Sequence, residues 1–247
     1  MQIQEILYSQ GFGTRRVCAG LVQQGMVAVC EAAAGDWTVC LDASHELEPE
    51  GLRFRVQGID WQYHAKAYLM LYKPAGVECS QKPSAYPSVY TLLPAPLRQR
   101  PSKSAVSGVQ AVGRLDQDTT GLLLLSDDGQ FIHRMSSPKK HVPKVYRITA
   151  KHEVSAAQVQ ALLAGVQLDD EPGLVRAAAC ERIDAHTLDL TLTEGKYHQV
   201  KRMIAAAGNR VLALHRHRIG GLVLPGDLAP GQWRWLAQHQ LELLRGA

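Results

Sequence analysis

The sequence predicts an α+β protein, because short strands are interrupted by isolated helices and do not form regular strand–helix–strand units. The clearest strand signal is Leu122–Leu125, a run of four leucines without polar alternation, which is typical of a strand buried on both faces. Gly121 opens this run, and Asp-Asp-Gly at 127–129 closes it with turn chemistry. Alternating apolar and polar residues over 187–193 predict a half-buried strand. Apolar residues at helical spacing over 198–207 predict an amphipathic helix.

The composition indicates a globular protein that works inside the cell. A chain of 247 residues can form one large domain, or a small domain and a larger one. No apolar run approaches the ~18 residues that a membrane helix needs, and the first residues lack the pattern of a signal peptide. The 5 cysteines are scattered and include no CxxC pair, so reduced thiols in a cytoplasmic protein without a membrane partner are expected.

The first 60 residues contain a helix signal followed by a strand signal. Thr14 is a candidate N-cap for a helix over 15–24, which a glycine ends before a strand near 27–29. Arg15 and Arg16 lie in the first turn, where the helix dipole disfavours cations and a bound polyanion would offset that cost. This pattern resembles the S4 RNA-binding domain, and the resemblance implies that Arg15 and Arg16 contact RNA.

Charge is unevenly distributed along the chain. Residues 1–65 contain four arginines against eight carboxylates, so the remaining residues carry a net +8 within the total of +4. Two tracts, 130–152 and 195–226, each contain six Lys or Arg residues and no Asp or Glu. Two acid-free basic tracts in one region predict a polyanionic partner. The alternative is two basic faces that are merely solvated.

A domain boundary is predicted at 62–66, so that the chain divides into residues 1–62 and residues 66–247. The second part opens with a strand over 67–72, which ends at Lys73-Pro74-Ala75-Gly76. Residues 94–109 are rich in Pro, Ser, Arg and Lys without periodicity, and they predict a flexible loop. The other elements expected are a strand within 139–149, a helix over 155–165 with capping-box spacing, and strands at 211–214 and 222–224.

Three stretches carry residues that are candidates for chemistry. The first, Gly113-Arg114-Leu115-Asp116, places Asp116 in a tight polar connection before the buried leucine strand, a position in which scaffolds often present a reactive group. The second contains Tyr146 in a basic strand, and the third is His-Gln-Val-Lys-Arg-Met at 198–203, with Lys201 at the edge of a helix. The structural alternatives are an Asx turn at Asp116, a core aromatic at Tyr146 and a surface lysine at Lys201.

Together with Lys73-Pro74-Ala75-Gly76, these stretches resemble the RNA pseudouridine synthases, in the same order and over about residues 67–236. The resemblance is closest to the branch that isomerises uridine 516 of 16S rRNA in the small ribosomal subunit. It implies an α+β catalytic domain built on a mixed, largely antiparallel sheet and preceded by a small S4-like domain. Making pseudouridine breaks the N1–C1′ bond and joins C5 to C1′. Neither a redox cofactor nor a metal is needed for this reaction, so no cofactor is expected.

The resemblance also implies roles for particular residues. Asp116 would be the catalytic carboxylate, either attacking C1′ as a nucleophile or taking a proton from C2′, and the sequence leaves both routes open. Tyr146 would stack on the flipped uracil, and Lys201 would pair with Asp116 and keep it ionised. Arg114 would contact the substrate RNA. The other basic residues expected to bind the RNA, chiefly at its phosphates, are Lys139, Lys140, Lys144, Arg202, Arg216 and Arg218.

Other functions remain open at this stage. One is the branch of the same family that acts on 23S rRNA, and another is an rRNA-binding protein without catalysis, which has no use for an ionised aspartate beside a lysine and a tyrosine. A third is a glycosidase acting on free nucleosides, for which weak salt dependence is expected. His215 and His217 are spaced as His-x-His, but no nearby Cys or paired carboxylate completes a metal site. The expected partner is 16S rRNA or a small-subunit assembly intermediate, bound by a monomer.

Overall fold

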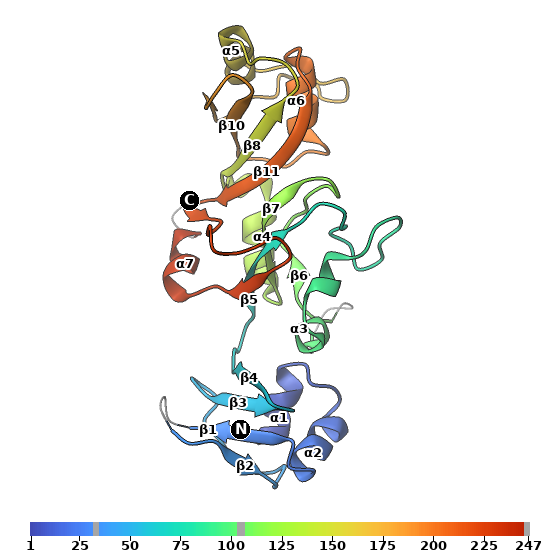
Figure 1. Ribbon diagram of the computed structural model, residues 1–247, viewed down its shortest axis with the longest axis vertical. Coiled ribbons are helices and arrows are strands. Elements are labelled where there is room, and N and C mark those ends of the chain that lie inside the picture. The colour runs from blue at the N-terminus through green and yellow to red at the C-terminus, as the bar shows by residue number, and fades with distance from the viewer. Residues whose placement is uncertain (32–34, 103–106, 245–247) are drawn as a thin grey trace. The chain divides into compact units, whose positions relative to one another are not determined.

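The computed structural model describes residues 1–31, 35–102 and 107–244, which form two compact units (Figure 1). The first unit consists of Met1–Ala67, Leu93–Gln110 and Ser126–Asp128. The second unit consists of Tyr68–Leu92, Ala111–Leu125 and Gly129–Ala247. The predicted boundary at 62–66 lies just before the end of the first segment. The sequence did not indicate that two later segments also belong to the first unit.

The first unit is built on an antiparallel sheet with strand order β2-β1-β3-β4. The fully buried side chains of Ile3, Ile6 and Phe54 belong to its core. The predicted cap at Thr14 is confirmed, because its side chain accepts a hydrogen bond from the backbone N–H of Val17 at 3.3 Å. The elements of this sheet and its helices are α1 (Ile3–Ser9), α2 (Arg15–Gln23), β1 (Val27–Cys30), β2 (Thr38–Cys40), β3 (Arg53–Val56) and β4 (Ile59–Gln62).

Residues 94–109 are not the flexible loop that the sequence predicted, as far as the structure describes them. They contain helix α3 (Ala95–Gln99), and its Leu97 is only 1% exposed. The backbone of Gly11 approaches α3 so closely that a Cβ there would lie 2.1 Å from the carbonyl oxygen of Pro96. A helix of five residues is too short to show a helical period, which explains the wrong prediction. Residues 103–106 of the predicted loop lie outside the described residues.

The second unit is built on a larger sheet with strand order β13-β5-β7-β11-β8-β10-β9. β7 pairs with β11 in parallel, whereas the pairs of β8 with β10 and β11, of β9 with β10 and of β5 with β13 are antiparallel. The expectation of a mixed, largely antiparallel sheet is therefore confirmed. The strands are β5 (Tyr68–Lys73), β6 (Gln110–Ala111), β7 (Thr120–Ser126), β8 (Lys144–Ala150), β9 (Ala179–Arg182), β10 (Thr187–Leu192), β11 (Val211–Ile219), β12 (Leu222–Val223) and β13 (Trp233–Trp235).

The leucine strand, β7, is buried on both faces as predicted, since Leu122–Leu125 have no exposed surface. Gly121 has a φ of +113° and lies opposite Arg216 in the parallel register with β11. A Cβ at Gly121 would lie 2.2 Å from the carbonyl oxygen of Arg216, so only glycine allows the two strands to approach here. This contact fixes the start of β7, and with it the preceding loop that carries Asp116, against β11.

Helices complete the second unit. The two that the sequence predicted here, over 155–165 and 198–207, are confirmed as α5 (Ala156–Ala164) and α6 (Gln199–Ala206). In α5 the hydroxyl of Ser155 accepts from the backbone N–H of Gln158, and the Gln158 side chain accepts in return from the backbone N–H of Ser155. α4 begins directly at Gly129, where the sequence showed only a turn. No helix in the described part of the chain is long and apolar enough to cross a bilayer. The helices are η1 (Val89–Leu92), α4 (Gly129–Ser136), η2 (Pro138–Lys140), α5 (Ala156–Ala164), α6 (Gln199–Ala206) and α7 (Gln238–Leu243), with η marking 3-10 helices.

Candidate active site

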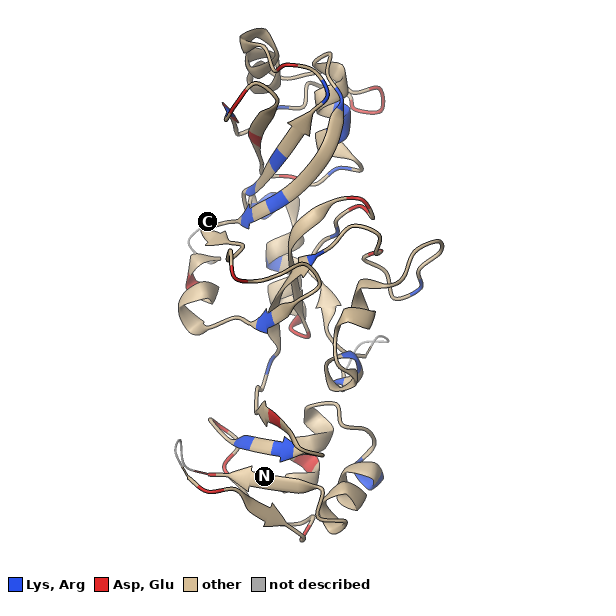
Figure 2. Cartoon of the chain, viewed as in Figure 1, with Lys and Arg blue, Asp and Glu red and all other residues tan. Residues whose placement is uncertain are grey.

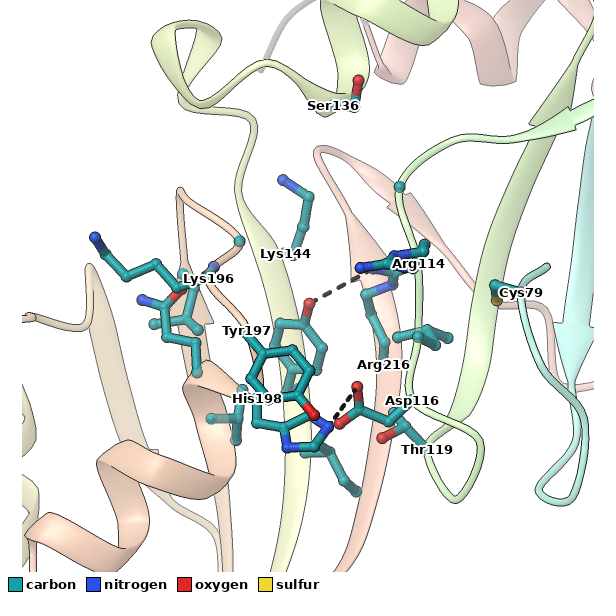
Figure 3. A pocket seen from close by; sticks show the side chains of 18 of the residues that line it. Cys79, Arg114, Asp116, Thr119, Ser136, Lys144, Lys196, Tyr197, His198 and Arg216 are labelled. Atoms are coloured by element: carbon teal, nitrogen blue, oxygen red, sulfur yellow. Dashed lines mark hydrogen bonds and ion pairs between the residues drawn. The ribbon is translucent and has the colours of Figure 1, made fainter. Parts of the chain in front are cut away.

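A pocket of about 470 Å³ in the second unit brings together the three stretches that the sequence singled out (Figure 3). The loop before β7 contributes Asp116 and Arg114, the strand β8 contributes Lys144 and Tyr146, and α6 contributes Lys201. These stretches are far apart in the sequence, and the order of β7, β11 and β8 in the sheet places them side by side. The three residues expected to carry the chemistry therefore share one pocket.

Lys73, at the end of β5, holds the loop that carries Asp116. The side chain of Lys73 has no exposed surface, and its Nζ donates to the carbonyl oxygens of Gln117 at 3.2 Å and of Thr119 at 2.9 Å. Burial lowers the pKa of this ammonium, which the surrounding carbonyl oxygens nevertheless solvate. The backbone N–H of Thr119 also donates to the carbonyl oxygen of Asp116 at 3.1 Å. Sequence reasoning quoted Lys73 only as part of a motif and missed this supporting role.

The expected ion pair between Asp116 and Lys201 is present, but Lys201 is shared with a second carboxylate. Its Nζ lies 3.1 Å from Oδ2 of Asp116 and donates to both carboxylate oxygens of Asp118, at 2.7 and 2.9 Å. Partial burial opposes protonation of Lys201, but the hydrogen bonds to Asp118 and Asp116 outweigh it, so the pKa of Lys201 is raised. Lys201 therefore stays charged. Asp118 was missed because a sequence does not reveal which carboxylate of Asp-x-Asp faces the helix.

Replacing Asp118 by asparagine should lower kcat for the modification of RNA about tenfold, which corresponds to about one pKa unit of altered interaction. Without the Asp118 charge, Lys201 pairs with Asp116 alone. The stronger pairing makes the carboxylate of Asp116 less reactive. KM should change little, because Asp118 is half-exposed and its charge is already neutralised by Lys201. Single-turnover and steady-state rates on the same RNA will measure both constants. An unchanged kcat would mean that Asp118 is only a surface partner of Lys201.

Tyr146 and Arg216 are neighbouring residues of the pocket lining. Tyr146 is half-buried, packs against the core and also lines the pocket. Arg216 is only 2% exposed, and its Nε donates to the carbonyl oxygen of Leu122 at 2.9 Å while Nη1 lies 3.5 Å from the Tyr146 hydroxyl. The sequence suggested an exposed arginine on the approach of the RNA, whereas Arg216 is a buried residue of the pocket lining. Its contact with the RNA stays a prediction. Its contacts orient Tyr146.

The remaining basic residues lie around the pocket or away from it. Figure 2 shows Lys and Arg on β8, β11 and α6, the elements that contribute to the pocket wall. Lys139, Lys140 and Arg218 are exposed and do not line the pocket. Arg202 forms an ion pair with Asp170. Arg15 and Arg16 belong to the first unit and are exposed there, and Arg15 pairs with Glu5 at 2.7 Å.

The two histidines of the His-x-His pattern have protein partners. Nδ1 of His215 lies 2.8 Å from the hydroxyl oxygen of Thr120, and Nε2 of His217 lies 3.2 Å from a carboxylate oxygen of Asp189. Burial lowers the pKa of both imidazoles. Over residues 1–31, 35–102 and 107–244, no group of three or more His, Cys, Asp or Glu side chains is arranged to hold a metal ion.

Comparisons with known proteins bear on the same residues. The family model for RNA pseudouridylate synthase matches residues 67–206, which include Asp116, Tyr146 and Lys201. The ribosomal small subunit pseudouridine synthase A of Escherichia coli (strain K12) is 43% identical over 180 residues, 73% of this chain and 74% of that protein. The protein of the same name from Yersinia pestis is 44% identical over 174 residues, 70% of this chain and 71% of that protein. A crystal structure of a pseudouridylate synthase superposes with a TM-score of 0.67 at 33% identity and covers 99% of both chains.

Proposed function

The chain belongs to the RNA pseudouridylate synthase family and is therefore an isomerase, and we propose that it converts one uridine of small-subunit ribosomal RNA to pseudouridine, with Asp116 as the catalytic carboxylate. The observation that carries this proposal is the convergence of Asp116, Lys201 and Tyr146 on one pocket. A ribosome-binding protein without catalysis has no need of such an arrangement. A site for free nucleosides has no need of the acid-free basic tracts around it.

The geometry supports a mechanism in which a uridine leaves the RNA stack and enters the pocket. The uracil ring would lie on Tyr146, which Arg216 holds in place, with its sugar toward Asp116. The carboxylate would then attack C1′ or take the proton from C2′. The N1–C1′ bond breaks, the base turns while still held on Tyr146, and C5 joins C1′. In the same step the carboxylate leaves C1′, or, on the other route, the proton returns to C2′. The proton lost from C5 balances the one gained at N1.

Lys201 would hold the reactive carboxylate in place, and Asp118 would share the charge of Lys201 with it. The raised pKa of Lys201 leaves its ammonium charged at neutral pH, and this ammonium lies 3.1 Å from Oδ2 of Asp116, where it orients the carboxylate. Arg114 is exposed at the rim of the pocket and would contact the RNA next to the flipped nucleotide. Lys139, Lys140, Arg202 and Arg218 would bind phosphates further along the strand.

The substrate proposed is 16S rRNA or a small-subunit assembly intermediate, modified at uridine 516 in the cytoplasm by the monomer. The names of the 43% and 44% identical relatives support the small subunit over the large one. The first unit would act as an S4-like module that places Arg15 and Arg16 against RNA.

Mapping pseudouridines in 16S and 23S rRNA, with and without the protein, tests the choice of substrate. The map is made on naked RNA and on precursor particles. A new pseudouridine in 23S rRNA alone would overturn the assignment to the small subunit.

Lys144 should make RNA binding sensitive to pH near neutrality. Burial, with a smaller effect of Arg216, lowers the pKa of Lys144 from 10.5 to about 8. Its ammonium is charged below that pH and neutral above it, so RNA affinity should fall as the pH rises from 7 to 9. We expect about a tenfold rise in Kd, the size of one hydrogen bond to a charged group.

The matched variant is Lys144→Arg, which keeps its charge throughout this range. Its Kd should stay level from pH 7 to 9, measured by filter binding at constant salt. A wild-type Kd that does not change over this range would contradict the role of Lys144 as an RNA contact.

A further inference from the structure

Tyr197 lies at the mouth of the pocket with its ring in solvent (Figure 3). Of the large apolar and aromatic side chains that the structure describes, none is more exposed than Tyr197, at 71%. Its ring stacks face to face on the imidazole of His198, with the ring centroids 3.8 Å apart and the planes 21° apart. One face of the phenol ring is therefore covered by His198, and most of the remaining surface is free. Core packing does not explain this placement.

The backbone around Tyr197 is held firmly, so the exposed ring is not on a loose loop. The carbonyl oxygen of Tyr197 accepts from Nη1 of Arg202 at 3.0 Å. Just before it, the backbone N–H of Lys196 donates to the buried side chain of Gln199, which in turn donates to Glu194. His198 itself adopts a left-handed conformation with a φ of +47°, which is unfavourable for a residue other than glycine. Such strain is concentrated at functional sites, where surrounding contacts enforce it.

The stacked pair is directly connected to the proposed catalytic carboxylate. Nε2 of His198 lies 3.5 Å from Oδ1 of Asp116, whereas Lys201 contacts the other carboxylate oxygen, Oδ2. Tyr197 extends the row outward from His198 toward solvent (Figure 3). An aromatic surface thus begins at the reacting group and ends outside the pocket.

Building on the proposed function, we propose that the Tyr197–His198 stack binds a nucleobase of the RNA strand next to the target uridine. When one nucleotide is flipped out, its neighbour loses a stacking partner in the RNA. An exposed aromatic face can take the place of that partner whatever the base, because every base has a π-face. Tyr146 is inside the pocket, where the target uracil would lie, so Tyr197 is free for the neighbour.

The charges nearby fit an RNA strand better than a protein segment. Pro138 lines the same pocket and begins η2, which carries the exposed Lys139 and Lys140. The structure gives neither lysine a carboxylate partner among the residues that it describes. A strand whose base stacks on Tyr197 would have cations available for its phosphates within the same region.

The test compares Tyr197→Ala with Tyr197→Phe, which keeps the ring and loses only the hydroxyl. Loss of one base–aromatic stack should raise Kd and KM for RNA about tenfold in Tyr197→Ala. The single-turnover rate at saturating protein should stay within about threefold of wild type. Tyr197→Phe should match wild type. The control is Tyr86→Ala, which removes a tyrosine that is 44% exposed and does not line the pocket. It should leave Kd and KM unchanged.

A second readout reports the stack itself. Once the modified uridine is mapped, 2-aminopurine is placed at the nucleotide on either side of it. Its fluorescence should be quenched by wild type and by Tyr197→Phe at one of the two positions, and much less by Tyr197→Ala at saturating protein. Equal quenching by Tyr197→Ala, or an unchanged Kd, would overturn the proposal. Both readouts compare each variant with wild type on the RNA that wild type modifies. If wild type proved inactive on small-subunit rRNA, only the proposed substrate would be refuted.

Discussion

Replacing Asp116 by asparagine is expected to lower the rate of pseudouridine formation by roughly 10⁴-fold, the scale for removal of an essential catalytic side chain. An amide of the same shape can neither attack C1′ nor take the C2′ proton. RNA binding should be largely retained, because the phosphate-binding residues are untouched. Lys201 also keeps its two hydrogen bonds to Asp118, so the variant does not leave an unpaired ammonium in the pocket. Single-turnover rates and Kd on the same RNA separate the two effects.

The matched control is Asp227→Asn, the same chemical change at an exposed aspartate that pairs with Arg234 outside the pocket. It should leave both the rate and Kd unchanged. If Asp116→Asn kept more than about a hundredth of the wild-type rate, the carboxylate would be a positioning group and the proposed mechanism would be wrong. If it instead lost RNA binding, Asp116 would have to shape the binding surface.

The sequence predicted those parts of the fold that are governed by local patterns. The four leucines of β7 required burial on both faces, and Thr14 and Ser155 had the capping chemistry of helix starts. It did not predict that α3 would pack into the first unit, because the reason lies in contacts with residues far away in the chain. The close approach of Gly11 to Pro96 is one such contact. No local pattern encodes it.

In the candidate site too, the sequence predicted what motifs carry and missed what depends on contacts between distant segments. Asp116, Tyr146 and Lys201 were found because each lies in a motif of the family that the sequence resembles, and they share a pocket. Asp118 lies two residues after Asp116, but the sequence could not assign it a role. Its pairing with Lys201 depends on how the loop before β7 meets α6. Arg216 is buried, although its position in a basic tract suggested exposure. The parallel pairing of β7 with β11 buries it instead.

Replacing Arg100 by methionine is expected to destabilise the first unit by about 3–5 kcal/mol, the usual range for breaking a buried ion pair from one side. Nε of Arg100 lies 2.6 Å from a carboxylate oxygen of Asp127, and their side chains are only 3% and 9% exposed. The other guanidinium nitrogens donate to Oε1 of Gln10 and to the carbonyl oxygen of His64, each at 2.7 Å. Arg100 thus joins the three segments of the first unit. Methionine would leave a buried carboxylate without its cation, and Gln10 and His64 would each lose one hydrogen bond while keeping the bonds to each other.

Urea unfolding measures the loss, and hydrogen exchange shows where it acts, with faster exchange expected in α3 and around His64. The double variant Arg100→Met, Asp127→Asn should regain part of the stability, because the uncompensated charge is gone. The side-chain oxygen of Asn at this position can still accept from the backbone N–H of Ala67, as Oδ1 of Asp127 does at 2.8 Å. Arg182→Met is the control, since Arg182 pairs with Glu153 at an exposed site and should contribute less than about 1 kcal/mol. Equal losses for Arg100→Met and Arg182→Met would mean that the buried pair does not hold the three segments together.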